Sequence, residues 1–159
     1  MKLTTKARYA VTAMADIAAC AETAPVAVSA VALRQGISVT YLEQLMGKLR
    51  KAGLVESVRG VSGGFKLARA AADIRVSEIV MAVDEQIKTT ACVPGAEAGC
   101  QGNSSRCLTH DLWDELGRQI EIFLAAATLD DVISRRVLGM AAVNAPDRSD
   151  ALDKSGAVL

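Results

Sequence analysis

Residues 29–55, SAVALRQGISVTYLEQLMGKLRKAGLV, constrain the fold of this chain more than any other stretch. Four apolar residues recur at the i, i+3, i+4, i+7 spacing of an amphipathic helix, namely Leu42, Leu45, Met46 and Leu49. Ser38 is a candidate cap for this helix and Gly53 a candidate stop, and Ser29 is a candidate cap for the shorter helix before it. A short helix, a turn and an amphipathic helix are typical of a helix-turn-helix unit.

A glycine-rich hairpin follows this unit directly. Val55–Arg59 and Phe65–Ala68 have the composition of two short strands, and residues 60–64 between them read GVSGG. A helix-turn-helix followed by a hairpin is the element order of a winged helix. We therefore predict a mostly α chain that contains a winged helix-turn-helix domain with a two-stranded wing, plus a long dimerisation helix.

Hydrophobic periodicity predicts further helices on both sides of this unit. A first helix is expected over about 4–21, preceding a short extended piece at 25–28, and a fourth over about 77–86, capped by Ser77. A long helix is expected over about 109–127 and a last one over 129–140, capped by Thr128. The predicted organisation is a DNA-binding domain at 1–72, a linking helix and cysteine-rich loop at 73–108, the dimerisation and C-terminal helices at 109–141, and a disordered tail at 142–159.

The net charge of zero hides an asymmetry along the chain. Residues 1–66 carry nine basic and four acidic residues, a net +5, while residues 67–159 carry nine basic and fourteen acidic residues, a net −5. A basic first half indicates a polyanionic partner, and the helix-turn-helix pattern favours double-stranded DNA. The candidate DNA contacts are Arg8, Ser38, Thr40, Tyr41, Glu43, Gln44, Lys48, Arg50, Lys51, Arg59, Gly60, Ser62, Gly63 and Gly64.

These candidates divide by chemistry. The basic side chains suit phosphates, which supply affinity, and the polar side chains in the first half of the second helix suit base edges. Glycines at the wing tip allow the backbone to approach a phosphate without a Cβ in between. Glu43 is unusual, because phosphates repel a carboxylate unless it accepts from a cytosine amino group. We expect Glu43 to act on selectivity rather than on affinity.

Three of the four cysteines and the single histidine fall between positions 92 and 110, in the pattern C-x7-C-x6-C-x2-H. Soft thiolates with one imidazole suit a histidine-ligated 2Fe-2S cluster or a zinc ion. The long, glycine-rich gaps favour a cluster over zinc, and redox-active thiols or a chance grouping remain alternatives. The candidate ligands are Cys92, Cys100, Cys107 and His110. We expect Cys20, on the buried face or at the end of the first helix, to be a small hydrophobe rather than a ligand.

The sequence also indicates in which cellular compartment this site functions. No run approaches 18 consecutive apolar residues, and the first residues lack the apolar stretch of a signal peptide, so we expect a cytoplasmic protein without a membrane span. In a reducing compartment, clustered cysteines are typical of metal ligands or reactive thiols rather than disulfides. Cys107 and His110 could form a nucleophile and base, but no further catalytic element is recognisable, so we do not expect an enzyme.

The expected helix at 109–127 carries a wide apolar surface. Leu112, Leu116, Ile120, Phe123 and Ala127 form one stripe, which Trp113, Ile122 and Leu124 widen. A domain of this size cannot easily cover such a surface. We therefore expect a partner helix.

Several of these motifs together resemble the IscR family of iron–sulfur cluster regulators. They are MKLTTKARYAVTAM, QGISVTYLEQLMGKLRKAGLVESVRG, VSGGFKLAR, SEIVMAVDE and CLTHDLW, and the resemblance covers about 1–136. It implies a homodimer joined through the helix at about 109–127, which reads a palindromic operator. It also implies a 2Fe-2S cluster held by Cys92, Cys100, Cys107 and His110, and a role for Glu43 in discriminating two classes of operator.

The same resemblance implies a transcription regulator that represses cluster-assembly genes when it holds the cluster and acts as an activator elsewhere. The cysteine gaps are slightly longer than in the commonest pattern of the family. Nitric-oxide sensors of the wider family use similar gaps and can hold a 4Fe-4S cluster, so an iron- or nitric-oxide-sensing regulator is one alternative. A zinc-stabilised winged helix without sensing, a redox carrier and a thiol enzyme are the others.

Overall fold

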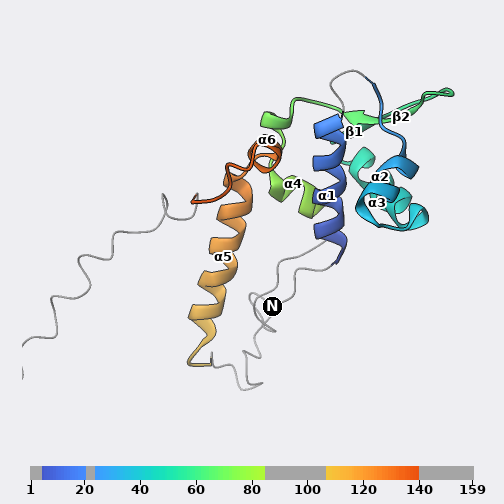
Figure 1. Cartoon of the computed structure of the whole chain (residues 1–159). Coiled ribbons are helices and arrows are strands. Elements are labelled where there is room, and N and C mark those ends of the chain that lie inside the picture. The colour runs from blue at the N-terminus through green and yellow to red at the C-terminus, as the bar shows by residue number, and fades with distance from the viewer. Residues whose placement is uncertain (1–4, 21–23, 85–106, 140–159) are drawn as a thin grey trace, which may run out of the picture.

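The computed structural model describes residues 5–20, 24–84 and 107–139 (Figure 1). The elements, in chain order, are α1 (Thr5–Cys20), α2 (Val28–Gln35), α3 (Val39–Lys51), β1 (Val55–Val58), β2 (Gly64–Leu67), a 3₁₀ turn (Ala71–Asp73), α4 (Val76–Ala82), α5 (His110–Ala126) and α6 (Leu129–Ile133). This mostly helical arrangement with a two-stranded antiparallel sheet confirms the predicted winged-helix fold class.

Helix α1 forms the centre of the core. Its buried face carries Ala10, Ala13, Met14 and Ile17, all at most 1 % exposed. It packs against α2 and α3 on one side and against α4 and α6 on the other (Figure 1). The alanines keep the helix narrow, which allows several neighbours to approach the same segment closely.

Helix α3 has the boundaries that its sequence predicts. The Ser38 hydroxyl accepts a hydrogen bond from the Tyr41 amide at 3.2 Å, which satisfies an N-terminal N–H group. Gly53 follows the helix with a φ of 71°, the left-handed conformation that ends helices. All four predicted apolar residues, Leu42 to Leu49, are buried.

The wing is a hairpin with an additional partner. In β1 and β2, Val55 lies opposite Leu67 and Val58 lies opposite Gly64. Val26 also exchanges two backbone hydrogen bonds with Phe65, each 2.8 Å long. The extended piece before α2, which the sequence predicts, therefore joins the wing to the helix-turn-helix unit.

A second backbone connection joins α4 to the end of α5. The Val76 amide donates to the Ala127 carbonyl at 2.9 Å, and the Leu129 amide donates to the Ile74 carbonyl at 2.8 Å. Arg75 extends this connection, because its guanidinium donates to the Ala126 carbonyl at 3.0 Å. The start of α4 and the turn from α5 to α6 therefore form one unit.

Two predicted helix caps are wrong. Helix α2 begins at Val28 after Ala27, so Ser29 lies inside its first turn. Helix α4 begins at Val76 after Arg75, so Ser77 also lies inside the helix, and the Glu78 carboxylate accepts from the Arg75 amide instead. In both cases an extended residue held by a distant backbone partner fixes where the helix begins.

Two further expectations need correction. Helix α6 ends at Ile133 rather than near 140, because Arg135 adopts a φ of 55° and breaks the helical path. Its predicted cap at Thr128 is confirmed. Cys20 is the last residue of α1 and is exposed, so of its two expected places the buried face is wrong and the helix end is right. The tail predicted from residue 142 lies outside the described residues.

Candidate functional site

The exposed face of α3 combines candidate base-reading residues in its first half with a candidate phosphate-binding lysine in its last turn. Thr40, Gln44, Gly47 and Lys51 follow one another at i, i+4, i+7 and i+11, opposite the buried apolar stripe. Thr40, Gln44 and Lys51 are exposed, as is Ser38 at the start of the helix. In helix-turn-helix proteins, the corresponding face of the recognition helix enters the major groove.

Tyr41 is less accessible than these exposed residues of α3. It is half-buried and packs edge-on against Tyr9 of α1, with ring centroids 6.0 Å apart and an interplanar angle of 80°. This aromatic pair ties the first turn of α3 to α1. Tyr41 therefore positions the N-terminal end of the helix as well as bordering its exposed face.

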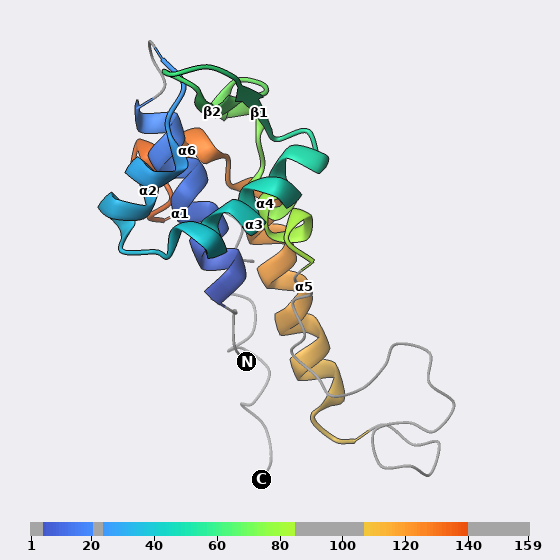
Figure 2. The ribbon, with the colours of Figure 1, turned by 90° about the vertical axis from the view of Figure 1, so that its right-hand side faces the viewer.

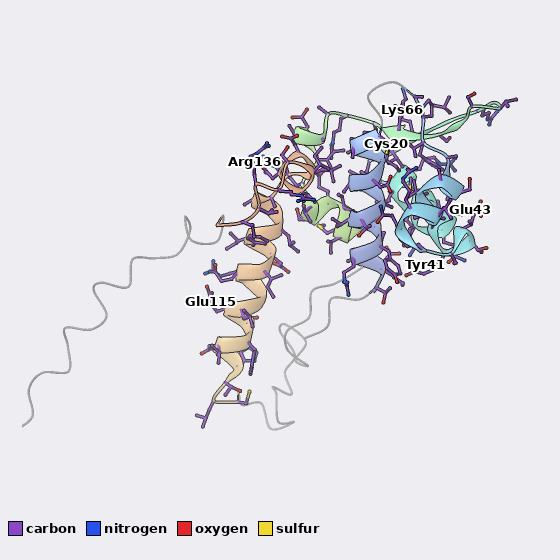
Figure 3. The ribbon with its side chains drawn as sticks, viewed as in Figure 1. Cys20, Tyr41, Glu43, Lys66, Glu115 and Arg136 are labelled. Carbon is purple, nitrogen blue, oxygen red and sulfur yellow. The ribbon has the colours of Figure 1, made fainter. Side chains whose placement is uncertain are left out.

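Glu43 is exposed on α3 and points away from α1 (Figure 3). It has no ion pair or hydrogen bond with any described side chain. A carboxylate without a cationic partner, next to Gln44, would repel phosphates and accept only from donor groups of bases. Its surroundings fit the expected role in selectivity.

The basic candidates divide into two groups. Lys48 Nζ lies 2.6 Å from Asp84 Oδ2, and Arg50 Nη1 lies 3.4 Å from Ser57 Oγ, so both side chains are engaged by other elements. Arg8, Lys51 and Arg59 are exposed and have no ion pair within the described ranges. The latter group offers its full charge to phosphates.

The wing glycines have structural roles that the sequence does not reveal. A Cβ at Gly63 would lie 2.4 Å from the Val58 carbonyl oxygen, and one at Gly64 would lie 2.3 Å from the Val26 carbonyl oxygen. Gly60 has a φ of 120°, which side-chain-bearing residues rarely adopt. All three glycines are required by the hairpin itself, whether or not a phosphate approaches. Ser62 is exposed beside them, and Lys66 pairs with Glu56.

A polar network that the sequence patterns do not predict fixes the helix-turn-helix unit. Asp16 of α1, 7 % exposed, accepts from Arg34 Nη2 at 2.6 Å and from Gln35 Nε2 at 2.6 Å. Burial raises the pKa of Asp16, but the hydrogen bonds from Arg34 and Gln35 outweigh it and hold the pKa below its ordinary value. One feature of the sequence could have predicted this network. Asp16 lies on the apolar side of the first helix, and a buried carboxylate requires a cationic partner.

The candidate metal ligands fall partly inside the described residues. Cys107 and His110 are both half-buried and occupy the turn where α5 begins, and the His110 amide donates to the Cys107 carbonyl at 3.0 Å. Cys107 Sγ lies 3.8 Å from Thr109 Oγ1. Cys92 and Cys100 lie outside the described residues, and within the described part no three His, Cys, Asp or Glu side chains gather as a metal site. One thiolate and one imidazole on the same turn fit an iron–sulfur cluster or zinc.

Helix α5 carries this pair at one end and extends past the other described helices (Figure 1, Figure 2). Gly117 is its only buried residue. Leu112 is 63 % exposed and Trp113 is 45 % exposed, while Leu116, Ile120 and Phe123 are half-buried. Within the described parts of the chain, the apolar stripe predicted from the sequence is therefore only partly covered: Leu112 near its start is exposed, and Ala127 at its end is buried. No helix among the described residues is long and apolar enough to cross a membrane.

Comparison with known proteins gives matches over most of the chain. Residues 3–135 match the model of the Rrf2 family, described as an iron-dependent transcriptional regulator. The HTH-type transcriptional regulator IscR of Vibrio atlanticus is 51 % identical over 133 residues, which cover 84 % of this chain and 75 % of that protein. IscR of Klebsiella pneumoniae is 48 % identical over 136 residues, which cover 86 % of this chain and 82 % of that protein.

Solved structures give the same result. The structure of T. potens IscR has a TM-score of 0.69 and 37 % identity, and the match covers 86 % of this chain and 88 % of that one. The structure of CymR, the global cysteine regulator of B. subtilis, has a TM-score of 0.71 and 29 % identity, with coverage of 85 % and 98 %. These IscR and CymR proteins are named as regulators rather than enzymes, in agreement with the sequence prediction.

Proposed function

This chain belongs to the Rrf2 family of transcriptional regulators, and from this premise we propose that it is a homodimeric DNA-binding regulator that senses a bound iron–sulfur cluster. The observation that carries the proposal is the position of Cys107 and His110. They lie at one end of α5, and the other end of α5 is joined by backbone hydrogen bonds to Ile74 and Val76 at the start of α4, a helix that packs against α1 and α3. A ligand change at one end can therefore act on the other.

The DNA-binding part of the proposal rests on α3 and the wing. Thr40 and Gln44 would enter the major groove, while Lys51, Arg59 and Arg8 would contact phosphates. The Asp16 network and the Tyr9–Tyr41 pair hold α2 and α3 in a fixed orientation on α1. Glu43 would select between operators, because it repels phosphates and accepts only from suitable bases.

The sensing part rests on four ligands, Cys92, Cys100, Cys107 and His110. A 2Fe-2S cluster bound by these residues would link the segment after α4 to the start of α5. His110 sits in the first turn of α5, so restraining its side chain restrains the helix axis. The hydrogen bonds from Val76 to Ala127 and from Leu129 to Ile74 then pass a shift of α5 to α4, which packs against α1 and α3.

The homodimer is proposed from the apolar face of α5. A second copy of the helix at about 109–127 would cover Leu112, Trp113 and their neighbours. Two copies related by a two-fold axis present two α3 helices, and this symmetry requires a palindromic operator. The regulator would repress cluster-assembly genes when it holds the cluster and activate other promoters without it. It would act in the cytoplasm.

Visible absorption of the full chain, purified without oxygen, tests the cofactor. We expect a coloured protein with about two iron atoms and two sulfides per chain, and loss of the bands in Cys107→Ala and His110→Ala. Cys20→Ala is the matched control, because Cys20 is an exposed cysteine of α1 that is not one of the four candidate ligands. About four irons per chain would indicate the 4Fe-4S alternative. A colourless protein with one zinc would contradict sensing.

Operator selection tests the link to DNA. The cluster-loaded chain and its Cys92→Ala, Cys100→Ala and Cys107→Ala variants are each offered a random-sequence duplex library, and the bound sequences are compared. We expect the three variants to select a different operator class from the loaded protein. Identical selection by all four proteins would contradict cluster-dependent operator choice, while leaving DNA binding intact.

A further inference from the structure

One basic residue of the proposed DNA-binding face already has an anionic partner within the chain. Lys48 lies one helical turn after Gln44 in α3, on the same side of the helix, so its ammonium is placed to reach a phosphate beside the groove. Its Nζ instead lies 2.6 Å from Asp84 Oδ2. Asp84 follows the end of α4, 36 positions further along the chain.

The structure holds Asp84 in place for this contact. Its backbone has a φ of 56°, a conformation that Asp and Asn tolerate better than most residues, and its amide donates to the Met81 carbonyl at 3.0 Å. The hydrogen bond and charge of Lys48 lower the pKa of Asp84, and Lys6 of α1 adds to this effect. The carboxylate is therefore fully ionised at neutral pH.

The pair is open to solvent. The side chain of Asp84 is 77 % exposed and that of Lys48 is 37 % exposed. Ion pairs this exposed contribute little to folding stability, so holding α3 and α4 together is a weak explanation for the contact. A DNA phosphate at the same ammonium would be a competitor with the same charge and the same acceptor chemistry.

We propose that Asp84 is an internal counter-charge for DNA binding: its carboxylate occupies the position of a phosphate at Lys48 and lowers the affinity of the chain for DNA of any sequence. The inference rests on the proposed DNA-binding function. Each phosphate contact adds to sequence-independent affinity and steepens its dependence on salt. Neutralising Lys48 within the chain removes one such contact. Base contacts by Gln44 and its neighbours then carry a larger share of the binding.

Asp84→Asn tests the proposal in the full chain. Asparagine keeps the size of the side chain and tolerates the same backbone conformation, but it lacks the charge. Binding of a mixed-sequence DNA duplex is measured at several salt concentrations. We expect Asp84→Asn to bind several-fold more tightly at low salt. The slope of log K against log salt should steepen by about one unit, the value for one added phosphate contact.

A double-mutant cycle separates this effect from a structural one. In a Lys48→Met background, Asp84→Asn should leave both the affinity and the salt slope unchanged. An unchanged slope in the single variant, or an equal gain in the Lys48→Met background, would overturn the role of Asp84. If the unaltered chain bound no duplex even at low salt, the proposed function itself would fail. The two failures are therefore distinguishable.

Discussion

Helix α3 buries four large apolar side chains against the rest of the chain, whereas α5, which is longer by four residues, buries only Gly117. Both helices have an apolar stripe at helical spacing, and the sequence patterns are of similar quality. The difference lies in the surroundings. Helix α3 has α1, α2, α4 and β1 beside it, while α5 extends past these elements with α4 as its neighbour (Figure 2).

An amphipathic pattern therefore predicts that a helix needs a partner, but not whether the same chain supplies it. For α3 the chain does so, and the polar face is left for another molecule. For α5 it is the apolar face that is left, which suits a second copy of the chain. Substitutions in the two helices should consequently act on different equilibria, folding for α3 and association for α5.

The largest effect is expected at the uncovered face of α5. Leu112→Glu places a charge where we propose the second copy packs, so the chains should separate and the avidity of two recognition helices should be lost. Affinity for a palindromic operator should fall by a factor of about 10²–10⁴. Binding to the selected operator, measured together with sedimentation velocity, checks this.

The matched control is Ala125→Glu, which adds the same charge at an exposed position on the other side of α5. It should leave both association and operator affinity close to those of the unaltered chain. Equal losses in the two variants would mean that added charge, and not the apolar stripe, decides the outcome.

The next effect is expected in the core under α3. Leu49 is completely buried, and Leu49→Ala should lower the free energy of unfolding by about 2–5 kcal/mol, through lost burial and a cavity. Chemical denaturation at constant protein concentration measures it. A loss that depended on protein concentration would contradict the assignment of α3 to the core of the single chain.

The smallest effect on stability is expected at two carboxylates, each of which accepts hydrogen bonds from one arginine and one glutamine. Asp16 binds Arg34 and Gln35, and Glu115 of α5 binds Arg118 and Gln119, but Asp16 is buried and Glu115 is exposed. Asp16→Asn should cost about 1.5–3 kcal/mol of unfolding free energy, typical of hydrogen bonds to a buried charge. Glu115→Gln, the control, should change stability little.

The contribution of Asp16 to the free energy of unfolding should decrease at acidic pH. The pKa of Asp16 in the folded chain lies below its ordinary value of 3.8, so its contribution is fully present above about 3.8 and is lost as the pH falls through the lower folded value. The stability difference between the unaltered chain and Asp16→Asn should therefore shrink below pH 4. A difference that grew on acidification would contradict the network.

Local patterns predicted most of this fold, and long-range pairing explains the errors. Ser38 and Thr128 cap helices as expected, because each is the extended residue directly before its helix; for Thr128, pairing with Arg75 agrees with the local preference. Ser29 and Ser77 do not, because Val26 pairs with Phe65 and Arg75 with Thr128, so the residues before each helix are held extended. A cap depends on where the helix begins, and distant partners set that point.

In the candidate site, too, features set by local helical spacing could be predicted, whereas contacts between distant parts of the chain could not. The order of exposed residues along α3 follows from helical spacing, so Thr40, Gln44 and Lys51 could be predicted. The partners of Lys48 and Asp16 could not, because Asp84 and Arg34 reach them only through the packing of other helices. The wing glycines were predicted for closeness to phosphate, yet Gly63 and Gly64 are already required by nearby carbonyl groups.

The mass of the full chain in solution, alone and bound to a palindromic duplex, tests most directly whether α5 is completed by a second copy. Sedimentation equilibrium should give twice the 16.6 kDa of one chain for the free protein, and two chains per duplex in the complex. A mass of 16.6 kDa for the free protein, with one chain per duplex, would contradict the homodimer and with it the proposal that a second copy covers the apolar face of α5.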